Sequence, residues 1–141
     1  MKKITLSLAL FSLMLFSCSN SDDEANITDN QIIGKWFYVS ETYDGEENTY
    51  PENCFNQQYY EFFSNGIISM KMYREPCQDS DDYNGNYVIV GNTLELTDLQ
   101  GSDDLNYSFE IVSLSETILI VEEEYTEDNE NFIYRLELRK E

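Results

Sequence analysis

The stretch Ile33-Gly34-Lys35-Trp36 opens the first strand-like segment of the chain and indicates how the rest is organised. Glycine weakens a strand unless the backbone must turn or approach another segment closely, so Gly34 marks a position with a specific backbone requirement. Trp36 is the only tryptophan, and residues 36–43 are rich in the aromatic and β-branched types that favour strands. We therefore expect Trp36 to close one end of a β core.

The beginning of the chain is typical of an export signal. A short basic segment precedes an apolar one over residues 4–16, which is too short for a stable membrane span. The next residues, Leu15-Phe16-Ser17-Cys18, resemble the lipobox of bacterial lipoproteins. The resemblance implies cleavage before Cys18 and acylation of that cysteine, and several acyl chains give stable anchoring. The alternative is an ordinary signal peptide with an incidental cysteine; we predict a lipoprotein signal peptide over residues 1–17.

Residues 18–31 are polar and acidic without an apolar period, which predicts a lipidated, flexible tether to a domain over residues 32–141. Within it, Ser21-Asp22-Asp23-Glu24 resembles the signal that sends lipoproteins of the Bacteroidetes group to the outer face of the outer membrane. The resemblance implies a lipid-anchored protein exposed on the cell surface. The alternative is a solvated linker on the periplasmic face of that membrane.

The charge of the chain limits its partners. The formal net charge is −20, and removing residues 1–17 takes away Lys2 and Lys3, so it falls to −22. Such a surface repels nucleic acid and favours basic partners. The sequence has no histidine, which removes the usual general base and zinc ligand. We expect no enzyme, no cofactor and no metal site.

Once Cys18 is acylated, two cysteines remain in the chain, Cys54 and Cys77. An even pair in an exported protein predicts a disulfide.

Eight strand candidates follow residue 32, separated by turn residues at short spacing. They cover residues 33–43, 57–63, 67–75, 85–90, 93–98, 105–112, 117–125 and 131–139. We expect loops over residues 44–56, 78–82 and 99–104. Short antiparallel strands joined by hairpins favour an all-β, eight-stranded up-and-down antiparallel β-barrel, because closure removes exposed sheet edges.

The hairpin around Ser64-Asn65-Gly66 allows two registers. A two-residue turn places Phe62 opposite Ser69, and a three-residue turn with Gly66 as a left-handed bulge places Phe62 opposite Ile68. Only the second register gathers the apolar side chains on one face, so we predict it. At Gly91-Asn92 a two-residue turn places Ile89 opposite Leu94 and gives the same result.

These features together are similar to a known family. Gly34-Lys35-Trp36 resembles the Gly-x-Trp signature of lipocalins, and Gly85-x-Tyr87 with the Gly91-Asn92 hairpin is similar to the small lipocalin-like domains of Bacteroidetes lipoproteins. The resemblance implies an arginine near the end of the last strand that packs over Trp36. Arg139 fits that role by position, and Arg135 is the second choice. The family also implies binding of small hydrophobic ligands.

The inward-facing side chains of such a barrel are the candidate ligand-binding residues. They are Tyr38, Tyr60, Phe62, Met70, Met72, Tyr87, Tyr107 and Tyr134. Methionines adapt to varied shapes and tyrosines offer hydroxyl groups. The alternative is a filled core with its hydroxyls at the mouth.

Two acidic segments have a functional and a structural interpretation. Asp79, Asp81 and Asp82 are compatible with calcium, but no closing glutamate follows at the required spacing, so we expect a solvated loop. Glu123 points inward near the mouth if the strand alternates. It then either holds a cationic ligand group or lies at the wet rim, and we expect the rim.

We predict a non-catalytic cell-envelope lipoprotein that binds a small hydrophobic or amphipathic molecule in its barrel. The alternative is a protein-binding barrel, such as an inhibitor of a basic hydrolase, because the strong negative charge speeds association with a basic partner.

Overall fold

The structure, a computed structural model, describes residues 29–48, 54–74, 77–100, 106–127 and 129–141. The predicted signal peptide, Cys18 and the acidic export motif lie outside these residues. Among the described residues, no helix is long and apolar enough to cross a membrane. The elements are α1 (Asp29–Ile32), β1 (Gly34–Tyr43), β2 (Glu46–Glu47), a 3-10 helix (Phe55–Gln57), β3 (Tyr59–Phe62), β4 (Ile67–Arg74), β5 (Asp79–Val90), β6 (Thr93–Gln100), β7 (Tyr107–Leu114), β8 (Ile118–Glu127) and β9 (Glu130–Lys140).

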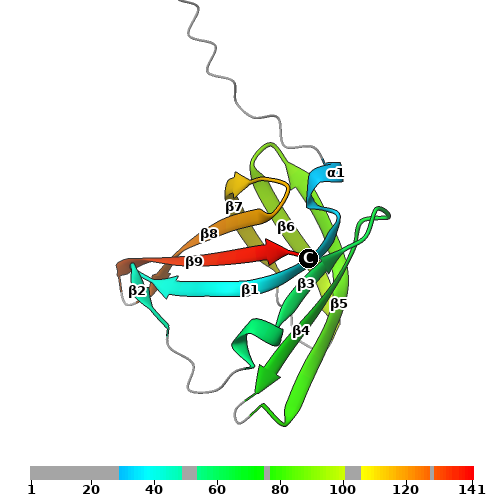
Figure 1. Ribbon diagram of the computed structural model, residues 1–141. Coiled ribbons are helices and arrows are strands. Elements are labelled where there is room, and N and C mark those ends of the chain that lie inside the picture. Colours follow the sequence, from blue (N-terminus) through cyan, green and yellow to red (C-terminus); the bar gives the residue numbers. More distant parts are fainter. Residues whose placement is uncertain (1–28, 49–53, 75–76, 101–105, 128) are drawn as a thin grey trace, which may run out of the picture.

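The predicted eight-stranded antiparallel barrel is confirmed. Strands β3 to β9 pair in chain order, and β1 pairs with both β3 and β9, so the sheet closes on itself. Figure 1 shows β9 and β1 lying side by side where the barrel closes. The two-residue strand β2 pairs antiparallel with the last two residues of β1 and is not one of the eight strands of the barrel. Closure leaves each of the eight strands with a partner on both sides.

Both predicted hairpin registers are confirmed. Phe62 lies opposite Ile68 across a three-residue turn, in which Gly66 has a φ of +79°. Ile89 lies opposite Leu94 across the two-residue turn. Each register directs its apolar side chains to the inside of the barrel, since a slip of one residue exchanges the two faces of a strand.

Strands β5, β6, β8 and β9 are longer than the sequence patterns predict. Leu99, predicted in a loop, is part of β6 and is 5% exposed. The pairing of β5 with β6 shifts between Asn84 and Asn86, and Asp98 has a φ of +53°. This bulge inserts one residue into β6 and turns Leu99 inward, which simple alternation does not predict.

The predicted acidic loop over residues 78–82 is also wrong, because β5 begins at Asp79. Asp81 accepts two hydrogen bonds from the Arg74 guanidinium, and Asp82 forms an ion pair with Lys71 at 3.6 Å. Adjacent residues of a strand point to opposite faces, so these two carboxylates do not converge on one ion.

One end of the barrel is closed by α1 and by the side chains packed beneath it. Ile32, the last residue of α1, and Trp36 are both fully buried. The Trp36 indole N–H donates a hydrogen bond of 2.6 Å to the carbonyl oxygen of Ile32. Residues 29–31, assigned to the tether from the sequence, are therefore part of the helical turn that covers Trp36.

The basic residue over Trp36 is Lys140. Its Nζ lies 4.9 Å from the centre of the Trp36 ring and donates to the carbonyl oxygen of Gln31 at 3.1 Å. The sequence-based choice of Arg139 is wrong, because Arg139 pairs with Phe37 and is exposed on the outer surface. Arg135, the second choice, forms an ion pair with Glu122 instead.

The position of Lys140 explains the glycine of the Gly34-x-Trp36 stretch. Gly34 has a φ of +128°, a backbone conformation that residues other than glycine rarely adopt. A Cβ atom at this position would lie 2.6 Å from Cε of Lys140. Gly34 thus allows the chain to leave α1, enter β1 and pass beneath the lysine.

A similar close approach occurs at Gly85 in β5. A Cβ atom there would lie 2.5 Å from the carbonyl oxygen of Thr97 and 2.8 Å from Cδ2 of Leu99. We predict that Gly85→Ala lowers the free energy of unfolding by about 1–3 kcal/mol, because a backbone oxygen cannot move aside without disturbing the β5–β6 pairing. Urea denaturation followed by circular dichroism measures the loss. Val88→Ala, at a residue that is 46% exposed on the outer face of the same strand, is the control, and an equal loss in both variants contradicts the steric argument.

Candidate functional site

The interior of the barrel is filled at the Trp36 end and contains a cavity of about 350 Å³ toward the other end of β1. Six strands and the residue before β3 contribute to its wall. The lining residues are Tyr38, Glu41, Tyr43, Gln58, Tyr60, Met70, Met72, Tyr107, Phe109, Glu123, Tyr125 and Tyr134. The wall is thus mainly aromatic and thioether-bearing, with two carboxylates.

Six of the eight predicted ligand-binding residues line this cavity: Tyr38, Tyr60, Met70, Met72, Tyr107 and Tyr134. Phe62 and Tyr87 do not. They pack edge to face in the filled part of the core, with ring centres 5.0 Å apart, and the Tyr87 hydroxyl donates to the carbonyl oxygen of Phe63. Inward alternation predicts which side chains face the interior, but it does not predict where the filled part ends.

Apart from Glu123, five lining residues are absent from the predicted site: Glu41, Tyr43, Gln58, Phe109 and Tyr125. Glu41 is the one among them that carries a charge. Strict alternation from Trp36 and Tyr38 places Glu41 on the outer face. The pairing of β1 with β9 shifts between Tyr38 and Ser40, and beyond this bulge Glu41 lies opposite Leu136 and faces inward. Glu41 is 5% exposed, and Asn48 donates to its carboxylate at 3.4 Å. The apolar residues around the bulge give no sequence signal for it.

Glu123 of β8 faces the cavity, as the alternation of that strand predicts. Partial burial raises the pKa of its carboxyl above the ordinary value of 4.5, because leaving bulk water disfavours the charged form. The structure therefore brings together two carboxylates from strands that are not neighbours in the sheet.

Several tyrosine hydroxyls of the cavity have a raised pKa and remain protonated at neutral pH. Burial raises the pKa of both Tyr38 and Tyr60 well above the ordinary range. Burial, followed by a hydrogen bond with Glu41, raises the pKa of Tyr43 to about 12. A protonated phenol donates one hydrogen bond, and the Tyr43 hydroxyl directs its bond to the Glu41 carboxylate.

One wall of the cavity is held in place by contacts around Tyr38. Its ring packs edge to face against Phe55 and Tyr60, with centres 5.4 and 5.5 Å away, and its hydroxyl donates to the sulfur of Met72 at 3.4 Å. Gln58 is buried and accepts a hydrogen bond from the backbone N–H of Tyr73 at 3.1 Å. Most of the wall is therefore preformed.

The raised pKa of Glu123 has a consequence for stability. A carboxyl whose pKa is higher in the folded than in the unfolded chain stabilises the fold at low pH, and this contribution is lost as the pH rises through the folded pKa. We predict that Glu123→Gln raises the melting temperature relative to wild type at pH 7 and that the difference shrinks toward pH 4. Thermal melts across this range test the prediction.

The matched control is Glu124→Gln, which removes the same charge from the neighbouring, exposed position of β8. It reports the general effect of reducing the net negative charge. The same pH-dependent gain in both variants argues against a local cost at Glu123.

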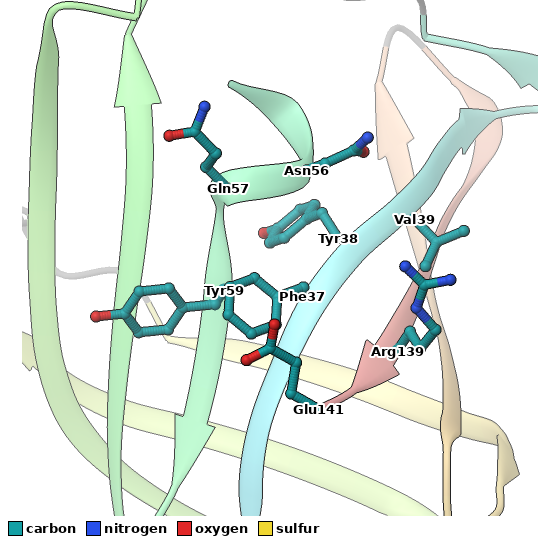
Figure 2. A pocket seen from close by; sticks show the side chains of 8 residues that line it. All are labelled: Phe37, Tyr38, Val39, Asn56, Gln57, Tyr59, Arg139 and Glu141. Carbon is teal, nitrogen blue, oxygen red and sulfur yellow. The ribbon is translucent and has the colours of Figure 1, made fainter. Parts of the chain in front are cut away.

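A second hollow, of about 480 Å³, lies on the outside of the barrel. Figure 2 shows its lining, with Phe37, Tyr59, Arg139 and Glu141 around the outer side of β1 and the 3-10 helix. The rings of Phe37 and Tyr59 are 5.8 Å apart. Several of its polar lining residues, including Arg139 and Glu141, are exposed, so a ligand here would keep much of its water. The interior cavity, with its more buried wall, is the better candidate site.

Within the described ranges, no group of three or more aspartate, glutamate, cysteine or histidine side chains is placed to hold a metal ion. The predicted disulfide is confirmed: Cys54 and Cys77 are bonded, with Cα atoms 5.5 Å apart. It joins the chain before the 3-10 helix to the turn before β5.

Comparisons with known proteins agree with this architecture. The family model for a lipocalin-like domain matches residues 32–121. A lipocalin-like protein from Bacteroides uniformis has a similar structure, with a TM-score of 0.57 and 18% identity, covering 79% of this chain and 99% of that chain. A protein from Bacteroides eggerthii has a TM-score of 0.55 and 13% identity, covering 77% of this chain and 98% of that chain. A bovine odorant-binding protein in complex with a selenium-containing odorant has a TM-score of 0.45 and 18% identity. The match covers 82% of this chain and 73% of that chain. Comparison with curated proteins gave no match.

Proposed function

Because the chain belongs to the lipocalin-like domain family, we propose that it is a non-catalytic binding protein that holds a small hydrophobic or amphipathic molecule in its interior cavity. The observation that supports this proposal is the cavity itself. Its volume of about 350 Å³ lies within the range of small-molecule sites, roughly 300–1,000 Å³. Met70, Met72 and Phe109 supply apolar surface, and the tyrosines supply donors that orient a ligand.

The test is a binding screen with retinoids, fatty acids and uncharged hydrophobic dyes, read by melting temperature and by tyrosine fluorescence. Trp36 is a poor reporter, because it lies in the filled end of the barrel. We expect at least one compound to raise the melting temperature in a concentration-dependent way. A panel without any shift contradicts the proposal.

A blocking variant links binding to the cavity. Met72→Trp places a larger side chain on the cavity wall, and we expect the affinity for any ligand found in the screen to fall at least about tenfold. Val90→Trp is the matched control, because Val90 is 61% exposed on the outer face of β5. Equal losses in the two variants indicate binding elsewhere.

We further propose that the protein is a lipoprotein, cleaved before Cys18, acylated there and displayed on the cell surface. The support is the lipobox-like stretch ending at Cys18 and the acidic stretch Ser21-Asp22-Asp23-Glu24. Protease treatment of intact cells is expected to release the domain. With Asp22, Asp23 and Glu24 replaced by alanine, the protein is expected to be lipidated but protected. Equal release of both versions contradicts surface export while leaving lipidation standing.

A further inference from the structure

The charged groups in the cavity wall all have the same sign. Glu41 of β1 and Glu123 of β8 face the cavity, and none of the described residues that line it is a lysine or an arginine. The other ionisable lining groups are tyrosines. Glu41 and Glu123 both act on the same ring: burial is the main cause of the raised pKa of Tyr60, and the charges of the two glutamates add to it. At neutral pH the cavity is therefore electronegative.

The aromatic side chains favour the same kind of ligand as the carboxylates. Faces of tyrosine rings attract cations, and carboxylates form short, charge-assisted hydrogen bonds with ammonium groups. Tyr43 and Tyr134 lie near each other, with ring centres 5.2 Å apart, and Phe109 lies 6.3 Å from Tyr134. A cation in this region would meet carboxylates and aromatic rings, while Met70 and Phe109 contact an apolar body.

Glu41 does not lie at a solvated rim: the residue is 5% exposed, so its carboxylate has lost most of its hydration. Asn48 and Tyr43 supply neutral hydrogen-bond donors to it. A ligand cation between Glu41 and Glu123 would offset the desolvation of both carboxylates at once.

We propose that the cavity selects amphipathic amines, with the ammonium group held by Glu123 and Glu41 and the apolar body held among the tyrosines and methionines. This inference rests on the proposed function and narrows it to one ligand class. It also implies discrimination against carboxylates, since an anion entering this cavity meets two glutamates and a chain of net charge −20.

Three probes with the same aromatic body test the selection: 1-naphthylmethylamine, 1-naphthalenemethanol and 1-naphthoate, which carry an ammonium, a neutral hydroxyl and a carboxylate. Isothermal titration calorimetry with the purified protein at pH 7 is expected to give an amine affinity at least about tenfold above that of the alcohol, with the naphthoate weakest. Equal affinities for amine and alcohol overturn the inference and leave the proposed function intact. No binding of the amine also overturns it, and the screen of retinoids, fatty acids and hydrophobic dyes then decides the proposed function separately.

Variants assign the effect to the cavity. Glu123→Gln is expected to weaken amine binding about tenfold and to weaken binding of the alcohol much less, and Glu41→Gln acts in the same direction. Glu123 is partly exposed, so its variant folds even if the more buried Glu41 is needed for stability. Glu124→Gln removes an equal charge from the outer face and is expected to leave both affinities unchanged. An equal loss of amine binding in Glu124→Gln shows attraction by net charge alone and overturns the inference.

Discussion

Replacing Trp36 by alanine is expected to lower the free energy of unfolding by about 3–5 kcal/mol. The side chain is fully buried, so its removal leaves a large void at the filled end of the barrel. Two further contacts are lost. The carbonyl oxygen of Ile32 loses its indole donor, and the ammonium group of Lys140 loses the ring beneath it. Urea denaturation followed by far-ultraviolet circular dichroism measures the change without depending on tryptophan fluorescence.

Trp36→Phe separates the loss of the indole hydrogen bond from the loss of the aromatic ring. Phenylalanine retains an aromatic ring under Lys140 but has no N–H for the carbonyl of Ile32, and an unsatisfied buried acceptor costs about 1–3 kcal/mol. We therefore expect a smaller loss than for alanine. Val112→Ala, at a residue that is 46% exposed on β7, is the control and should change little. A loss below about 1 kcal/mol for Trp36→Ala would mean that α1 and Trp36 do not close the barrel.

The barrel was predictable because its strands carry a strong alternation. The turn at Gly66 and the turn at Gly91 each allow only one register that keeps apolar side chains together, and both registers are confirmed. The position of Trp36 at a closed end follows from the same reasoning. These features depend on residues that are close in the sequence, where pattern and turn chemistry act together.

Two of the errors arise where the alternation changes phase. The bulge between Tyr38 and Ser40 turns Glu41 inward, and the bulge at Asp98 turns Leu99 inward. A bulge inserts one residue without a characteristic composition, so the sequence beyond it is assigned to the wrong face. The choice of Arg139 in place of Lys140 over Trp36 has a different cause. The alternation of Leu136 and Leu138 already places Arg139 on the outer face and Lys140 on the inner one, whereas Arg139 was chosen from the family resemblance.

The candidate site was predicted in outline but not in its chemistry. The inward tyrosines and methionines indicate an aromatic interior, and Glu123 was recognised as an inward carboxylate. Its partner Glu41 depends on the β1 bulge, and the division of the interior into a filled end and a cavity depends on the packing of side chains from distant strands. The presence of two carboxylates in one cavity could therefore be found only from the structure.

The second large effect is expected at the disulfide. Cys54 and Cys77 are separated by 23 residues, and closing a loop of this length stabilises the fold by about 3 kcal/mol in the chain-entropy model. Cys54 is buried, and the neighbouring Phe55 packs against Tyr38 of the cavity wall. The bond thus holds the 3-10 helix against the side of the barrel that contains the cavity.

We predict that Cys54→Ala combined with Cys77→Ala lowers the free energy of unfolding by about 2–4 kcal/mol without changing the fold, because the barrel closes through β1 and β9 independently of this bond. Denaturation in urea measures the loss, and circular dichroism checks the fold. Reduction of the wild-type protein should give the same loss, whereas a reductant should not affect the double variant. Proteolysis between residues 44 and 58 should accelerate in both cases, since the segment is then attached at fewer points. Mass spectrometry under non-reducing conditions provides the direct check: two free thiols in protein exported through its native route would show that the bond does not form there.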